Sequence, residues 1–188
     1  MTGITHQMIA LLMAFWLLTI YPVSIGPILG ALAIIGVMIG ALTPDLDQPT
    51  ANIWRRMLGG RAIGNIFQFF SGGHRHVTHS LIGIFLIGWF LRQGIIMFVN
   101  HNYISSALVL WSAFMIGYIS HPVADTLTDQ GVPWLWPLHI KVKIPPGPEE
   151  VRVTTDSIVE RLLVRGAIIV SFFFLLSSHW ATLLRLFK

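Results

Sequence analysis

The sequence predicts an all-α membrane protein: a polytopic helix bundle of about five spans, with surface amphipathic helices and a small β-hairpin outside the membrane. Composition is the first reason, because 54% of the 188 residues are hydrophobic and only 11% are charged, against about 25% charged in an ordinary soluble domain. The second is that apolar residues form five long runs, each close to the roughly 20 residues that cross a bilayer core. The length suits one membrane-embedded domain over residues 1–188.

The five predicted spans follow one another as residues 4–21, 23–42, 81–99, 103–123 and 166–184. Only Pro22 separates the first two, which predicts a tight helical hairpin, and a short turn separates the third from the fourth. The second run is rich in glycine, which permits close helix packing in a membrane. Arg92 interrupts the third run.

The two long connections, residues 43–80 and 124–165, hold most of the polar residues. In the first, apolar residues recur at helical spacing with arginines between them, which predicts one or two amphipathic helices at the membrane surface. An irregular loop is the alternative, because Gly59 and Gly60 interrupt the pattern. In the second, residues 139–153 alternate with period two around a proline-rich turn, which predicts the β-hairpin. Ser157 and Glu160 are spaced as in a capping box that opens the last helix.

Basic residues are distributed unequally between the two sides of this arrangement. With five spans, the N-terminus and both long connections share one side, and all of the 12 Lys and Arg residues fall there except Arg92, Arg185 and Lys188. The positive-inside rule therefore places the N-terminus on the cytoplasmic side of the inner membrane. The net charge of +4 comes without a block of Lys and Arg, so we expect no nucleic-acid partner.

Four polar clusters fall on this same side, each at the start or end of a predicted span. They are His6; Asp45 with Asp47; His74, Arg75, His76 and His79; and His121 with Asp125. His121 and Asp125 are four residues apart, so they share a helix face and could hold one ion. Each cluster alone has a simpler alternative: a His–Asp hydrogen bond, turn capping by the two aspartates, or a solvated basic loop.

The clusters together predict a metal centre. Cysteine is absent, so any metal must be held by nitrogen and oxygen ligands. At least three histidines with two or three aspartates suit Zn²⁺, with Mn²⁺ or Fe²⁺ as alternatives, better than Mg²⁺. This set exceeds the four ligands of a single zinc ion, so we expect one or two ions, the latter bridged by a carboxylate.

The motifs resemble the YdjM family of membrane-bound, metal-dependent hydrolases of bacteria and archaea. The resemblance covers nearly the whole chain and rests on His6, residues 42–49 (LTPDLDQP), residues 74–80 (HRHVTHS), and residues 117–128 (GYISHPVADTLT) followed by 131–137 (GVPWLWP). His76 stands where the family pattern has glycine, which favours its neighbours His74 and His79 as ligands. The order His, Asp, His, His-x-x-x-Asp is also similar to zinc-dependent phospholipase C, which implies that His6, Asp45, His79, His121 and Asp125 are ligands, with Asp125 bridging.

The leading hypothesis is an integral membrane hydrolase that cleaves a phosphoester of a lipid or lipid-linked substrate with a metal-activated water. Asp47 would orient or deprotonate the water, and Arg75 would stabilise charge on the phosphoryl oxygens. The expected metal ligands are His6, Asp45, His74, His79, His121 and Asp125. A metal-ion transporter or sensor, or a non-catalytic protein with a structural metal, is the alternative. Ligands gathered at one end of the spans favour a site over a conduit.

Overall fold

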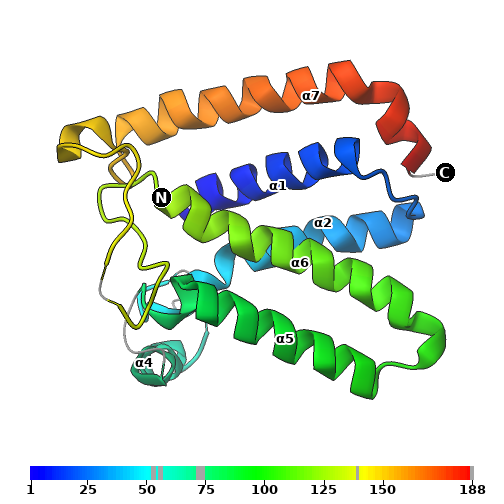
Figure 1. The fold of residues 1–188 in the computed structure, drawn as a ribbon, viewed down its shortest axis with the longest axis horizontal. Helices are drawn as coiled ribbons and strands as arrows, with labels where there is room; N and C mark the ends of the chain where they lie inside the picture. The colour runs from blue at the N-terminus through cyan, green and yellow to red at the C-terminus, as the bar shows by residue number, and fades with distance from the viewer. Residues whose placement is uncertain (52–53, 55–56, 71–74, 139, 187–188) are drawn as a thin grey trace.

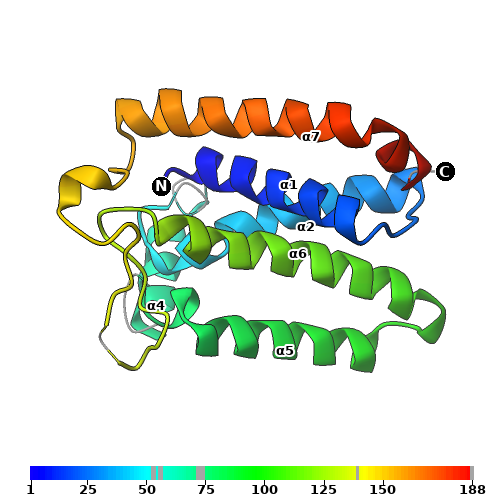
Figure 2. The same cartoon turned by 45° about the horizontal axis from the view of Figure 1, so that its top comes forward.

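Five long helices lie side by side, and the polar connections gather at one end of them (Figure 1). In the computed structural model the described residues are 1–51, 54, 57–70, 75–138 and 140–186. The helices are α1 (Gly3–Ile20), α2 (Pro27–Leu42), α5 (Leu81–Phe98), α6 (Ile104–Asp125) and α7 (Arg165–Leu186). The N-terminus lies at the end that carries the long connections, while short connections close the opposite end (Figure 2).

Four of these helices are long and apolar enough to cross a membrane. They comprise Gly3–Ile20, Pro27–Asp47, Leu81–Phe98 and His101–Asp125. Their outer faces carry large exposed apolar side chains such as Ile28, Phe85 and Phe98, which are 67–83% exposed. A lipid-facing surface has this character, since a soluble bundle would present polar residues there. The predicted membrane bundle is therefore confirmed for four spans.

The fifth predicted span forms α7, which lies alongside α1 with Phe172 in edge-to-face contact with Phe15 at 5.2 Å between ring centroids. Its helix is interrupted at His179, where φ is −122° and ψ is 19°. It is not among the four candidate spans found in the described residues. Five spans therefore remain a prediction.

Glycines bring the backbones of α2 and α6 into direct contact near the polar end. A Cβ on Gly40 would lie 2.1 Å from the carbonyl oxygen of Phe114, and one on Gly117 would lie 2.0 Å from that of Val37. Small residues at a crossing let membrane helices approach this closely. The small, fully buried Ala41 adjoins this crossing. The close approach sets the end of α2 against the last turns of α6, where the candidate ligands begin.

The predicted β-hairpin is not formed among the described residues, which contain no strand. Val132 and Val142 form an isolated antiparallel bridge, and Thr128 and Val153 form an isolated parallel one. The two alternating segments thus each pair with the loop that follows α6, and not with each other. The turn between them contains three prolines, which have no N–H to donate to a ladder. The loop that follows α6 also contacts the start of α5, because the carbonyl of Trp134 accepts a hydrogen bond from the N–H of Leu81.

One of the predicted amphipathic helices forms as α4 (Gly60–Phe70), and its position at a membrane surface stays a prediction. Its axis runs across the bundle, because Figure 1 shows it end-on while the long helices lie in the plane. The glycine pair that interrupts the pattern marks its beginning, with Gly59 at φ 71°. Residues 52–53 and 55–56, where the predicted amphipathic pattern begins, lie outside the described residues. The capping prediction holds in part: Ser157 Oγ accepts from the N–H of Glu160, whose carboxylate accepts from the N–H of Asp156.

Candidate metal centre

The last turn of α6 carries the first two candidate ligands, His121 and Asp125, both fully buried. One turn apart, they face the same way, with His121 Nε2 3.6 Å from Asp125 Oδ2. His121 Nδ1 lies 2.7 Å from the carbonyl oxygen of Ala41. A carbonyl oxygen only accepts, so Nδ1 carries a proton, and in the neutral ring Nε2 therefore presents its lone pair to the site. This is the tautomer that a metal ligand needs.

His6 comes from the first turns of α1 and lies against the same pair. Its ring stacks on that of His121, with centroids 3.6 Å apart and an interplanar angle of 8°. Its Nε2 is 3.3 Å from Asp125 Oδ1. Neither ring nitrogen of His6 has a hydrogen-bond partner within the described part of the chain. His6 is therefore buried and aimed at the site.

A second group of ligand atoms joins the first through His121. It contains Asp45 of η1 (Pro44–Asp47), His79 of η2 (Val77–His79) and His121, with their ligand atoms within 4.8 Å of one another. His121 Nε2 lies 3.4 Å from Asp45 Oδ1, and His79 Nε2 lies 3.8 Å from Asp125 Oδ2. The group of His6, His121 and Asp125 satisfies the same 4.8 Å limit. Four separate segments of the chain thus meet at one point.

Asp47 is linked to His79 through the hydroxyl of Thr78. Its Oδ2 accepts a hydrogen bond of 2.5 Å from Thr78 Oγ1 and one of 3.0 Å from the N–H of Arg75. Thr78 Oγ1 also lies 2.9 Å from His79 Nδ1. Because the hydroxyl proton goes to Asp47, the proton between Thr78 and His79 belongs to Nδ1, and Nε2 of His79 again presents a lone pair. Burial lowers the pKa of His79, outweighing the opposing effect of Asp47, and so favours the neutral ring.

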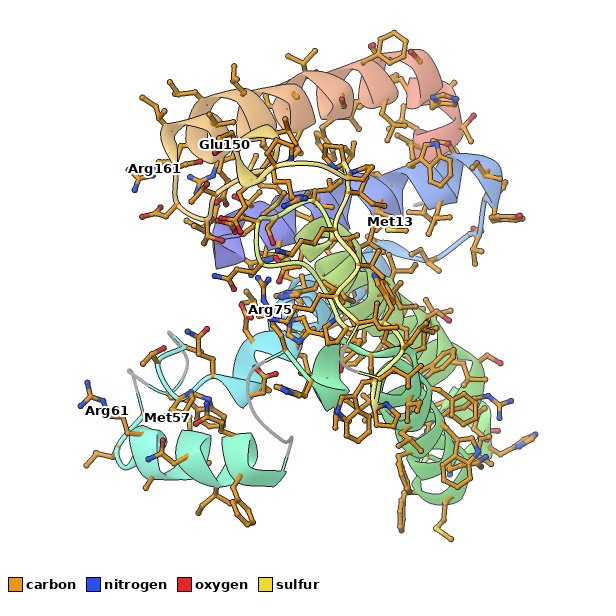
Figure 3. The ribbon with its side chains drawn as sticks, turned by 60° about the vertical axis from the view of Figure 1, so that its left-hand side comes forward. Met13, Met57, Arg61, Arg75, Glu150 and Arg161 are labelled. Atoms are coloured by element: carbon orange, nitrogen blue, oxygen red, sulfur yellow. The ribbon has the colours of Figure 1, made fainter. Side chains whose placement is uncertain are left out.

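Arg75 lies two residues before η2, and its side chain reaches the centre. Its backbone is left-handed, with φ at 59°, a conformation that costs free energy in a residue other than glycine. The guanidinium lies 2.5 Å from Asp125 Oδ2 through Nη2, and Nη1 donates to the carbonyl of Gly131 at 3.2 Å. The amino group of Met1 lies 2.7 Å from Asp125 Oδ1. Both oxygens of Asp125 therefore face positive groups. Figure 3 shows Arg75 between the bundle and α4.

The donor set fits a divalent metal ion. Lone pairs on the Nε2 atoms of His79 and His121 face the carboxylate oxygens of Asp45 and Asp125 at 3.4–3.8 Å. Acceptors that face acceptors repel one another unless a cation lies among them. The buried ring nitrogens of His6 and Nε2 of His121 also have no hydrogen-bond partner among the described residues, and each such atom costs about 1–3 kcal/mol. Imidazole and carboxylate together suit Zn²⁺, Mn²⁺ or Fe²⁺.

Most of the residues predicted from the sequence lie at this centre. The structure brings together His6, Asp45, His79, His121 and Asp125, with Asp47 and Arg75 beside them. His74 lies outside the described residues, and its ligand role stays a prediction. His76 is half-buried just before η2 and belongs to neither ligand group.

Three supporting residues were not predicted. Thr78 links Asp47 to His79, and Tyr118, fully buried, donates from its hydroxyl to the carbonyl of Thr78 at 2.7 Å. Thr128 Oγ1 accepts from Arg75 Nη1 at 3.4 Å. Tyr118 precedes His121 by three residues and therefore shares its helix face, a spacing that could have identified it.

Comparison with known proteins gives one family and several relatives. The sequence model of the YdjM inner membrane protein family matches residues 1–186. The chain is 29% identical to the "Inner membrane protein YdjM" of Escherichia coli over 119 residues, which are 57% of this chain and 50% of that protein. It is 30% identical to the "Uncharacterized protein YvsG" of Bacillus subtilis over 143 residues, 75% of this chain and 77% of that protein. The match thus spans about half the length of the Escherichia coli relative. No solved structure matched the chain.

Proposed function

Since the chain belongs to the YdjM inner membrane protein family, we propose that it is an integral membrane metal-dependent hydrolase. The bond cleaved is a phosphoester of a lipid or lipid-linked substrate. One observation carries this proposal: three buried histidines and two aspartates from four segments converge at one end of the apolar helices, with a buried arginine against them. Such a centre joins ligands for a metal to a positive group suited to phosphoryl oxygens.

The residues of the centre would hold the ion as neutral imidazoles and carboxylates. A divalent ion bound there would lower the pKa of water toward neutrality and polarise a phosphoryl oxygen. His121 can offer only Nε2, because its Nδ1 donates to Ala41, so the two ligand groups compete for one nitrogen. Asp125 has one oxygen toward His6 and the other toward His79 and His121. We therefore propose that His121 and Asp125 would hold one principal ion, and that His6 and Asp125 would contribute to holding a second where one binds.

Arg75 and Asp47 complete the proposed chemistry. Arg75 places a guanidinium beside Asp125, where it would stabilise charge on the phosphoryl oxygens of a bound substrate. Asp47 accepts from Thr78 and from the N–H of Arg75. These contacts support orientation of His79 and of the Arg75 segment by Asp47, in addition to the role toward water inferred from the sequence.

The membrane arrangement fits a lipid substrate. The centre lies at the end of the spans, with exposed Leu81 and Ile82 at the adjoining start of α5. A substrate could thus present its headgroup without leaving the bilayer. We propose that this end is cytoplasmic, following the distribution of Lys and Arg, and that α7 is a fifth span.

A metal-ion transporter or sensor fits less well. Its ligands should lie along the spans, yet the sequence has no Asp, Glu, His, Lys or Arg between Pro27 and Leu42 or between Ile104 and Ser120. A purely structural metal is favoured by one observation: the centre ties α1, α6, η1 and η2 together. Measured hydrolysis of a substrate would distinguish the proposed function from both of these, because neither a transporter nor a structural metal requires it.

The test is hydrolysis by detergent-purified protein of glycerophospholipids and isoprenoid phosphates, with Zn²⁺, Mn²⁺ or Fe²⁺ added. We expect phosphoester cleavage by the wild type, and its loss in Asp125→Asn, which keeps the shape of the side chain but weakens it as a ligand. Arg75→Lys should retain metal but turn over slowly, because the planar fork is lost. Full activity in Asp125→Asn would contradict the metal mechanism, and no activity on any substrate with metal bound would favour the structural role.

A further inference from the structure

The outer face of α4 is apolar and exposed. Ile63, Ile66 and Phe69 are 41%, 59% and 81% exposed, and Leu58 just before the helix is fully exposed. Successive residues of a helix are rotated by about 100°, so Ile63, Ile66 and Phe69 share one arc. The opposite arc carries the polar residues Arg61, Asn65 and Gln68. A short helix so clearly divided is typical of one that lies in a membrane interface.

The position of α4 agrees with this character. Its axis crosses the long helices, so it runs parallel to the plane of a membrane that they span (Figure 1). It follows η1, which continues directly from the end of the span Pro27–Asp47. The helix is thus at the level where hydrocarbon meets headgroups. Arg61 is exposed and points away from the bundle (Figure 3), where it can meet lipid phosphates.

The inner face of α4 is fitted to the segment that carries the metal-site carboxylates. Gly60 and Gly64 lie one turn apart and pack on Trp54, which is 7% exposed. A Cβ on Gly64 would lie 2.9 Å from Pro49 Cα and 3.0 Å from Trp54 Cδ1. Trp54 Nε1 donates to the carbonyl of Leu46, the residue between Asp45 and Asp47. A single side chain therefore joins the helix to both carboxylates.

We propose that α4 binds the lipid surface through Ile63 and Ile66, with Leu58 beside them, and that Trp54 transmits this anchorage to η1 and so fixes Asp45 and Asp47 at headgroup level. The occupant of the apolar face is the bilayer in which the spans themselves lie. Among the described residues between η1 and α4, the N–H groups of Gln48, Ala51, Trp54, Met57 and Gly60 each donate to the carbonyl three residues earlier. Together with the hydrogen bond from Trp54 to Leu46, these bonds connect α4 to η1.

The first test reads the depth of α4 in lipid. The chain has no cysteine, so Ile63→Cys and Asn65→Cys each accept one environment-sensitive fluorophore, and these positions lie on opposite faces of the helix. In phosphatidylcholine nanodiscs, with and without phosphatidylglycerol, the label at 63 should be quenched several-fold more by doxyl-labelled lipid and several-fold less by iodide than the label at 65.

Equal access of iodide to both labels would overturn the proposal. Protection of the label at 63 from iodide and from lipid quencher alike would assign the face to a protein contact and would overturn it too. These outcomes involve neither metal nor substrate, so they are independent of the proposed hydrolase activity.

The second test addresses Trp54 as a positioning residue. Gly64→Ala must move α4 away from Trp54, whereas Gly94→Ala makes the same change in α5 where no atom lies within 4 Å. We expect the amides of residues 44–48 to exchange hydrogen several-fold faster in Gly64→Ala than in Gly94→Ala, with both proteins still in the membrane. Equal exchange in the two variants would show that α4 does not hold η1.

Discussion

The same three helices, α1, α2 and α6, enclose very different spaces at the two ends of the bundle. Near the end with short connections they leave a cavity of about 560 Å³, lined mostly by apolar side chains such as Leu17, Ile34 and Leu108. Near the other end, His6, His121 and Asp125 fill the space between them and are at most 1% exposed. Apolar side chains need only approximate complementarity, while buried polar ones need partners of fixed geometry. Substitutions should therefore be tolerated at one end and costly at the other.

The largest effect is expected for Asp125→Ala. It leaves the buried guanidinium of Arg75 and the amino group of Met1 without their carboxylate, and removal of one partner of a buried ion pair costs about 3–5 kcal/mol. We expect this loss in the free energy of unfolding in detergent, together with loss of metal. Leu17→Ala at the cavity is the control, since an adjoining cavity is already present. A smaller loss in the free energy of unfolding for Asp125→Ala than for Leu17→Ala would contradict the expected difference between the two ends of the bundle.

The next effect concerns the crossing of α2 and α6. Gly117→Ala places a methyl group 2.0 Å from the carbonyl oxygen of Val37, whereas Gly36→Ala, farther from the centre on the same pair of helices, meets its nearest atom at 3.5 Å. Overpacking typically costs about 1–3 kcal/mol, and we expect the upper part of that range for Gly117→Ala. Its metal affinity should also fall, because His121 and Ala41 separate. Thermal unfolding and calorimetric Zn²⁺ titration measure both, and equal behaviour of the two variants would contradict this reading.

Glu160 should show a smaller, pH-dependent effect. Burial opposes its ionisation, but hydrogen bonds from Thr5, Thr2 and Asp156 outweigh burial and lower its pKa from 4.5 to about 2. A lowered pKa stabilises the fold above about pH 4.5, and this contribution is lost as the pH falls toward 2. We expect Glu160→Gln to cost about 2 kcal/mol at pH 7.

The difference between Glu160→Gln and the wild type should shrink as unfolding is followed from pH 5 down to pH 2. A difference that stays constant with pH would assign the role of Glu160 to shape and not to charge. Since Arg165 also donates to Thr2 and Thr5, Arg165→Lys is a useful companion that keeps the positive charge while changing the geometry.

A comparably small effect on stability is expected for Thr78→Val, which keeps the shape but removes the hydroxyl that bonds both Asp47 and His79. Each of these two hydrogen bonds contributes about 0.5–1.5 kcal/mol. Loss of an orienting partner typically weakens metal binding by 10–100-fold. Calorimetric titration with Zn²⁺ checks this, and unchanged affinity would show that the contact does not orient His79.

Much of the site could be predicted because its signals are local. His121 and Asp125 share a helix face through their spacing, and His6 and Asp45 reach the same end because helices of similar length alternate in direction. These inferences need only the number and direction of the spans. The carbonyl of Ala41 that fixes the tautomer of His121 could not be predicted, since every residue offers a backbone carbonyl and only the fold selects one.

The errors arise where tertiary contacts decide. Period-two alternation after residue 139 predicted a hairpin over residues 139–153. Val142 instead pairs with Val132 and Val153 with Thr128, and both partners lie outside the predicted hairpin. Gly59, interpreted as a possible break in a helix, occupies the left-handed turn that starts α4. The interruption of α7 at His179 occurs without glycine or proline, so no residue type at this position predicts it.

The central claim is that the polar end of the bundle is a metal centre. The most direct test is metal content by mass spectrometry of detergent-purified protein, wild type beside His121→Ala, after reconstitution with Zn²⁺ or Mn²⁺. We predict one or two ions per chain in the wild type and their loss in His121→Ala, because His121 belongs to both ligand groups. A wild type that binds no metal, or a variant that retains all of it, would contradict the account.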